Sequence, residues 1–208
     1  MDTPKAKIAI EINDAGLILV EGDVARPPSP GVAVWDGGQL FVGAEAWSRC
    51  RRLPGDADDR FWDRLGQQSL ARPLGPARSA ADLAHAHLAA IWKTAATKED
   101  GALLTVTGAA NEEHIALVLG IAQSAGIPVR GVVDAGLACA LEAPPEAAAI
   151  VHADTQLHRA VVTRIEAGEM LVRAQVALVN PFGLQPLTDR WLRFLADCFV
   201  RTTRFDPL

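Results

Sequence analysis

Acidic side chains at the ends of apolar, strand-like segments are the first candidates for chemistry in this sequence. Asp134 directly follows the apolar segment 129–133, and a helical pattern joins that segment to an earlier one at 103–107. Two strands joined by a helix pair in parallel and present their following loops at one edge of the sheet. The carboxylate of Asp134 is therefore a candidate catalytic or binding group at that edge.

Two histidines flank a second acidic residue, Asp154. Facing strands would allow His152, Asp154 and His158 to approach one another. A metal site built from them lacks an evident fourth ligand, and lone histidines at strand ends are more often structural. We therefore expect no metal site. No Ser-His-Asp or Cys-His arrangement supports a hydrolase.

Residues 103–142 carry the start and stop signals of alternating strands and helices. Asn111 is a good N-cap for the helix after the first strand, and Gly126 ends that helix, with Pro128 behind it. A second helix, rich in small residues, is expected at 137–141. The order of strand, helix, strand and helix predicts an α/β fold.

The same segment resembles the nucleotide-binding domain of DnaK-type (70-kDa heat-shock) chaperones. The matching residues are Thr105-Val106-Thr107, Ala125-Gly126, Val132-Val133-Asp134 and Ala138-Cys139-Ala140. The resemblance implies an actin-like ATPase (ribonuclease H-like) fold, with a mixed sheet and flanking helices. It also implies ATP with Mg²⁺ as cofactor, and a metal-water or water-orienting role for Asp134.

A strand–turn–strand pattern occurs twice, near residue 8 and again near residue 148. In actin-like ATPases, each of two lobes offers one such turn to the nucleotide phosphates. We therefore predict a first lobe at 1–145, with 24–78 as a small inserted subdomain, and the start of a second lobe at 146–208. The family's second lobe is longer, so we expect a fragment or a natural remnant of a longer protein.

The resemblance places the first phosphate turn at Glu11-Ile12-Asn13-Asp14-Ala15, where the family has Asp-Leu-Gly-Thr-Thr. It implies Glu11 as a catalytic acid and Asn13, Asp14 and Ala15 as cofactor-binding positions. A phosphate turn needs glycine, because its backbone N–H groups must come close to the ligand. Here Asn13 replaces the glycine, and Asp14 adds negative charge where phosphates would sit.

The second phosphate turn falls on Asp154, Thr155 and Gln156, where the family has Asp-Leu-Gly-Gly-Gly-Thr, and residues 152–158 contain no glycine. Trp47, shortly after Val42-Gly43, stands at the position of the family's catalytic lysine. Phosphoryl transfer depends on positioning and charge stabilisation, and tryptophan supplies neither. Losing about three charge-assisted hydrogen bonds, at roughly 1.5–3 kcal/mol each, costs about 4.5–9 kcal/mol.

We therefore expect a chaperone-like homologue of the nucleotide-binding domain that hydrolyses ATP weakly or not at all. It would act as a protein-interaction or chaperone-related module with a protein partner or client. One alternative is an active ATPase or kinase of the same fold with unconventional phosphate turns. Another is a structural or assembly protein of the actin-like superfamily.

Composition narrows the partners and the compartment. The net charge is −5 and no basic block exceeds residues 49–52, so we expect no nucleic-acid partner. No apolar run approaches the roughly 20 residues of a membrane span, so we expect no membrane partner. Cys50, Cys139 and Cys198 are widely spaced and odd in number, which indicates reduced thiols in a cytoplasmic protein.

Two apolar features await a structural explanation. Phe61 and Trp62 stand between opposite charges in a loop, either as a partner-binding knob or, as we favour, as an anchor that holds the loop to the core. An amphipathic helix is predicted at 187–201. If the second lobe is truncated, apolar faces near 172–199 lack a cover, and we expect a homodimer or poor solubility.

Overall fold

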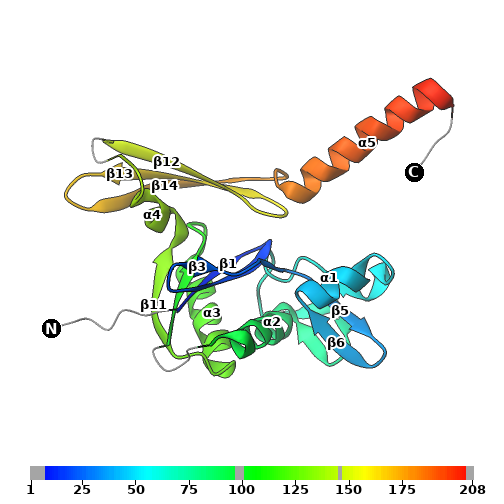
Figure 1. The fold of residues 1–208 in the computed structure, drawn as a ribbon, viewed down its shortest axis with the longest axis horizontal. Helices are drawn as coiled ribbons and strands as arrows, with labels where there is room; N and C mark the ends of the chain where they lie inside the picture. Colours follow the sequence, from blue (N-terminus) through cyan, green and yellow to red (C-terminus); the bar gives the residue numbers. More distant parts are fainter. Residues whose placement is uncertain (1–7, 97–100, 145–146, 205–208) are drawn as a thin grey trace.

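The structure, a computed structural model, describes residues 8–96, 101–144 and 147–204. They form an α/β protein in which helices flank a mixed sheet (Figure 1), as the sequence predicts. β10 pairs in parallel with both β1 and β11, while β1 and β2 form the predicted antiparallel hairpin. The strands of this main sheet, in spatial order, are β11 (Val129–Asp134), β10 (Ala102–Val106), β1 (Ile8–Asn13), β2 (Gly16–Glu21) and β3 (Val24–Ala25), and β4 (Ser29–Pro30) also pairs with β2.

The alternation of side chains along β1 divides the main sheet into a core face and a second face. Ile8, Ile10 and Ile12 are buried in the largest apolar cluster, together with residues of α2 (Ala80–Thr94) and α3 (Glu112–Ser124). These two helices cover one side of the sheet (Figure 1). Because successive side chains of a strand point to opposite faces, Glu11 and Asn13 lie on the other side.

Both covering helices have capped N-termini, and the cap of α3 is the predicted one. Ser79 and Asp82 form a capping box, in which each side chain accepts a hydrogen bond from the other residue's backbone N–H. The side chain of Asn111 accepts from the backbone N–H of His114 at 2.8 Å. These caps satisfy N–H groups that the first turn of a helix leaves without intrahelical partners.

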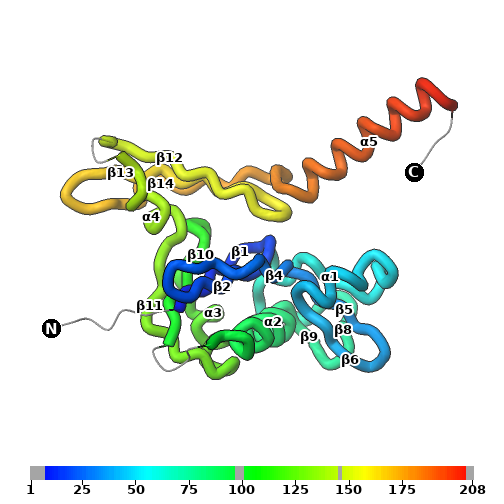
Figure 2. Tube along the Cα trace, viewed as in Figure 1, coloured from blue at the N-terminus to red at the C-terminus, as the bar shows by residue number. Residues whose placement is uncertain are grey.

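A smaller region between β4 and α2 lies beside the main sheet (Figure 2). In its loop, Phe61 is 0% exposed and Trp62 is 3% exposed, so these aromatic residues anchor the loop in the core. The elements of this region are β5 (Ala33–Asp36), β6 (Gln39–Val42), α1 (Ala44–Cys50), the 3-10 helix η1 (Pro54–Asp56), β7 (Ala57–Asp58), β8 (Ser69–Leu74) and β9 (Ala77–Ser79).

A second, three-stranded antiparallel sheet follows the main sheet in the chain. It consists of β12 (Ala149–Thr155), β13 (Ala160–Ala167) and β14 (Leu171–Val179). α4 (Ala135–Ala140) packs against all three strands and separates them from the main sheet (Figure 1). α5 (Leu184–Thr203) then projects away from both sheets (Figure 1). None of the helices in the described ranges is both long and apolar enough to cross a membrane.

A buried histidine ties three parts of the core together. His87 of α2 is 1% exposed. Its Nδ1 accepts a hydrogen bond from Trp62 Nε1 at 3.1 Å, so the ring proton lies on Nε2, which is 2.8 Å from Ser29 Oγ of β4. Burial lowers the pKa of His87 from 6.5 to about 3. The folded protein therefore holds this imidazole in its neutral form.

This neutral imidazole predicts acid sensitivity. Between about pH 3 and pH 6.5, unfolding lets His87 bind a proton, so stability is full above the unfolded pKa and falls as the pH drops. In His87→Gln, the free energy of unfolding should depend on pH less steeply than in the wild type, by about 1.4 kcal/mol per pH unit. Urea titrations from about pH 4 to pH 6 measure both slopes. Identical slopes would contradict a buried neutral His87.

Candidate functional site

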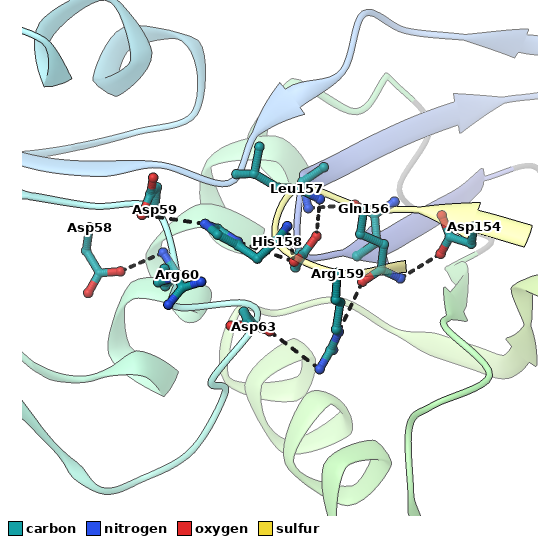
Figure 3. A network of polar contacts seen from close by, with 12 residues as sticks. Asp58, Asp59, Arg60, Asp63, Asp154, Gln156, Leu157, His158 and Arg159 are labelled. Carbon is teal, nitrogen blue, oxygen red and sulfur yellow. Dashed lines mark hydrogen bonds and ion pairs between the residues drawn. The ribbon is translucent and has the colours of Figure 1, made fainter. Parts of the chain in front are cut away.

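The β1–β2 turn and the β12–β13 turn meet at a buried carboxylate. Asp14 is 2% exposed, and its carboxylate accepts hydrogen bonds from the backbone N–H groups of Leu157 at 2.5 Å and His158 at 2.9 Å. The Nδ1 of His158 lies 3.3 Å from the same carboxylate (Figure 3). The two turns predicted to bind phosphate are therefore joined directly to each other.

The first turn also satisfies its own polar groups. The Asn13 side chain accepts from the backbone N–H of Ala15 at 2.9 Å and donates to Glu11 at 3.1 Å. Each predicted site residue of this turn, Glu11, Asn13, Asp14 and Ala15, thus has a hydrogen-bond partner within the chain. In particular, the N–H of Ala15 is already occupied.

The second turn starts later than the sequence predicts. Asp154 and Thr155 belong to β12, where they pair with Val161 and Ala160, and only Gln156 of the predicted binding residues lies at the turn. The prediction of a turn at 154–157 is wrong in its start, because the antiparallel register of β12 and β13 continues to Thr155. Gln156 is fully buried and donates to Asp154 at 2.6 Å (Figure 3).

A third segment, the anchored loop before β8, also reaches the tip of the β12–β13 hairpin. The Nε2 of His158 lies 3.9 Å from Asp59, and Arg159 lies 3.5 Å from Asp63 (Figure 3). Phe61 stands between these two acids in the sequence, and its buried side chain holds the loop that carries them in place. The hairpin tip is therefore held by the first turn and by this loop.

Asp134 lies at the carboxyl end of β11, opposite Val106, as the sequence predicts. Its side chain caps α4 by accepting from the N–H groups of Gly136 at 2.8 Å and Leu137 at 3.2 Å. Its second oxygen accepts from Arg173 of β14 at 2.7 Å. Asp134 therefore joins the two sheets and is charge-paired within the chain.

Arg173 and Gly108 complete this contact. Arg173 also donates to the backbone oxygen of Gly108 at 3.0 Å. A Cβ atom at position 108 would lie 2.8 Å from the hydroxyl of Thr163 and 3.3 Å from the Asp134 carboxylate, so a larger residue here would require Thr163 to shift. The hydroxyl of Thr163 is buried and has no hydrogen-bond partner in the described part of the chain.

Two predicted acids act together on a cysteine of α4. Partial burial raises the pKa of the Cys139 thiol, and the negative charges of Glu11 and Asp154 raise it further. A thiol is nucleophilic only as the thiolate, so this environment disfavours covalent chemistry at Cys139. The same two carboxylates would also repel an anionic ligand that approached α4 from this side.

The histidines considered for a metal do not converge. His158 faces Asp14, whereas a Cβ at Gly136 would lie 3.3 Å from the Nδ1 of His152, which places His152 against α4. Asp154 instead pairs with Gln156. Within the described ranges, no group of three or more His, Cys, Asp or Glu side chains could hold a metal ion.

The family's lysine position and a large hollow both lie apart from the two turns. Trp47 is 51% exposed on α1 and makes no part of the contacts around Asp14. A hollow of about 1370 Å³ lies between α2, α3 and the loop 64–68. His114 lines it, and burial, followed by the positive charge of Arg159, lowers the pKa of this histidine. The hollow is therefore flanked by a neutral histidine and not by phosphate-binding N–H groups.

Several residues of this site carry no signal in the sequence. Asp59 and Asp63 lie in a loop, Arg159 lies in the β12–β13 turn and Arg173 lies on β14, and each is an ordinary charged residue. Their partners in these contacts lie far away in the chain, for example 65 residues between Gly108 and Arg173. In the sequence, only the acidic residue Asp14 indicated that the first turn is unusual.

Known proteins give no further guide to this site. No protein-family model matches the chain, and no curated protein matches it.

The Asp14 contact predicts a large loss of stability on its removal. Asp14→Ala leaves two buried N–H groups without acceptors and should lower the free energy of unfolding by about 3–5 kcal/mol. Asp14→Asn keeps an acceptor oxygen and should cost less. Asp63→Ala is the matched control, because its carboxylate also contacts the hairpin tip but is 24% exposed, and it should cost less than about 1 kcal/mol. Equal losses for Asp14→Ala and Asp63→Ala in urea titrations would contradict this account.

Proposed function

We propose that this chain is a protein-interaction or chaperone-related module on an actin-like scaffold that neither binds nor hydrolyses ATP. The observation that carries the proposal is the Asp14 carboxylate, which accepts the N–H groups of Leu157 and His158. These are the groups that a phosphate turn would direct at its ligand. An internal anion takes the place of the phosphate and leaves no donor for it.

The topology supports the actin-like scaffold. The main sheet has the order β3-β2-β1-β10-β11, with β2 antiparallel to the three strands that follow it in this order. An antiparallel meander, β12-β13-β14, then begins a second unit in the way β1-β2-β3 begins the first. This repetition favours the division into a first lobe and the start of a second, and it places the two hairpin turns face to face.

The remaining catalytic candidates support a function without hydrolysis. Asp134 would orient a water or a metal-bound water in an active enzyme, yet its carboxylate is bound to Arg173 and to the cap of α4. Glu11 is bound to Asn13, and no lysine stands where Trp47 does. Among the described residues, each group that the resemblance assigns to phosphoryl transfer is therefore either replaced or engaged elsewhere.

A protein partner suits the surface that remains. The hollow beside α2 and α3, at about 1370 Å³, exceeds the roughly 300–1,000 Å³ of small-molecule pockets.

We assign the protein to the cytoplasm, where the free thiols of Cys50, Cys139 and Cys198 stay reduced.

A nucleotide titration tests the proposal. A ligand with a Kd of about 10 μM would, at about 1 mM, stabilise the protein by about 2.7 kcal/mol, which is several degrees in Tm. We expect Mg²⁺–ATP at about 1 mM to leave the Tm of the wild type unchanged and calorimetry to detect no heat of binding. Micromolar, Mg²⁺-dependent affinity would overturn the proposal and favour an active ATPase with unconventional turns.

An anion titration tests the role assigned to Asp14. Asp14→Ala frees the N–H groups of Leu157 and His158, so inorganic phosphate should raise the Tm of this variant more than that of the wild type. Chloride at equal ionic strength controls for general salt effects, and Asp63→Ala controls for an unrelated lost carboxylate. An equal response of the wild type and Asp14→Ala to phosphate would show that these N–H groups are not an anion site.

A further inference from the structure

The apolar side of α5 has no partner in the described chain. Among the described residues, 13 of the 18 large apolar side chains left exposed lie between 170 and 200. Those on α5 include Trp191, 58% exposed, and Phe194, 56% exposed. The full set is Met170, Val172, Leu178, Val179, Phe182, Leu184, Leu187, Trp191, Leu192, Phe194, Leu195, Phe199 and Val200.

Contacts at the start of α5 direct it away from its own sheet. The backbone N–H groups of Leu184 and Gln185 donate to the carbonyls of Gln156 and Leu157, at 2.9 and 2.8 Å. Gly183 lies against the same turn, where a Cβ would stand 2.6 Å from the Leu157 oxygen. The helix therefore leaves from the hairpin tip and projects outward (Figure 1), so its apolar side cannot cover β12–β14 of the same chain.

We propose that α5 pairs with α5 of a second copy of this chain, in antiparallel orientation. Its apolar residues recur at the three- and four-residue intervals of a heptad seam. Leu184, Trp191 and Cys198 form one column of the seam, and Leu187 and Phe194 form the other. In an antiparallel pair, Trp191 packs against Phe194 of the other copy, and Leu187 packs against Cys198 of the other copy.

Charge complementarity selects this orientation. The antiparallel register brings Arg190 beside Asp197 of the second copy, twice by symmetry, because both residues occupy the same flanking heptad position. A parallel pair would instead place Arg201 against Arg201 in the seam, and like charges there oppose association. In the antiparallel pair, the stem of Arg201 lies over Leu184 of the other copy, and its guanidinium reaches water.

The area to be covered is sufficient for a stable dimer. The chain has an accessible surface of 12748 Å², whereas a compact monomer of 22.1 kDa is expected to have about 9,300 Å². Part of this excess lies on the exposed apolar side of α5, and an interface of standard size buries roughly 800 Å² of each partner. Fully buried aromatic side chains bury about 150–250 Å² each. Trp191 and Phe194 are 58% and 56% exposed, so pairing would cover roughly 150–300 Å² of their surface on each copy.

Sedimentation of the wild type and of charge variants tests the association. We expect the wild type to sediment as a dimer at micromolar concentration. Arg190→Glu and Asp197→Arg should each weaken dimerisation about tenfold, and the double variant should restore it. Arg193→Glu is the matched control, because it lies on the opposite side of α5 and should leave the dimer unchanged. Arg190, Arg193 and Asp197 are all exposed, so circular dichroism should show an unaltered fold.

Disulfide cross-linking tests the orientation in a Cys50→Ala, Cys139→Ala background. With Leu187→Cys added, mild oxidation should join position 187 of one copy to Cys198 of the other, giving a covalent dimer with two bridges. Without Leu187→Cys, Cys198 should stay unlinked, because the antiparallel seam keeps the two Cys198 residues apart. A wild-type monomer at high concentration would overturn the pairing. Rapid Cys198–Cys198 linkage, or no rescue by the charge swap, would overturn its antiparallel orientation.

Discussion

The buried carboxylate of Asp14 is the interaction on which the arrangement of the two sheets depends. A carboxylate removed from water is costly unless hydrogen bonds compensate it, and here two backbone N–H groups and an imidazole of the β12–β13 turn do so. The same contact satisfies the N–H groups of Leu157 and His158, which lie in the β12–β13 turn and take no part in strand pairing. Neither turn could adopt its present position without the other, because each supplies what the other lacks.

The second junction between the sheets follows the same rule. Asp134 caps α4 with one oxygen and binds Arg173 of β14 with the other, so the helix, the main sheet and the second sheet are fixed at one residue. Acids that a nucleotide-binding protein would keep available for metal and water are used here to hold the scaffold. Asp14 and Asp134 are thus both engaged in contacts within the chain.

Local signals in the sequence predicted the elements well. The N-cap at Asn111 and the hairpin patterns depend on residues within a few positions of each other, and both appear in the structure. The sequence predicts a turn from Asp154, whereas the pairing of β12 continues to Thr155, opposite Ala160. The polar composition of this segment is typical of a turn and gives no sign of the pairing. The contact of Asp14 with the β12–β13 turn could not be predicted from the sequence for another reason. Its partners are set by how the two sheets pack together and not by any residue near Asp14 in the chain.

The burial of Asp14 has a consequence for the order in which the protein assembles. Asp134 is the last residue of the main sheet in the chain. Once it has been synthesised, all strands of this sheet are present and can pair without any later residue. The acceptor at Asp14 must wait for His158, 144 residues further along the chain, before it meets its donors. Until then the first turn carries an unpaired charge in water. Docking of the second sheet therefore belongs to the last stage of folding, when that charge exchanges its hydration for backbone donors.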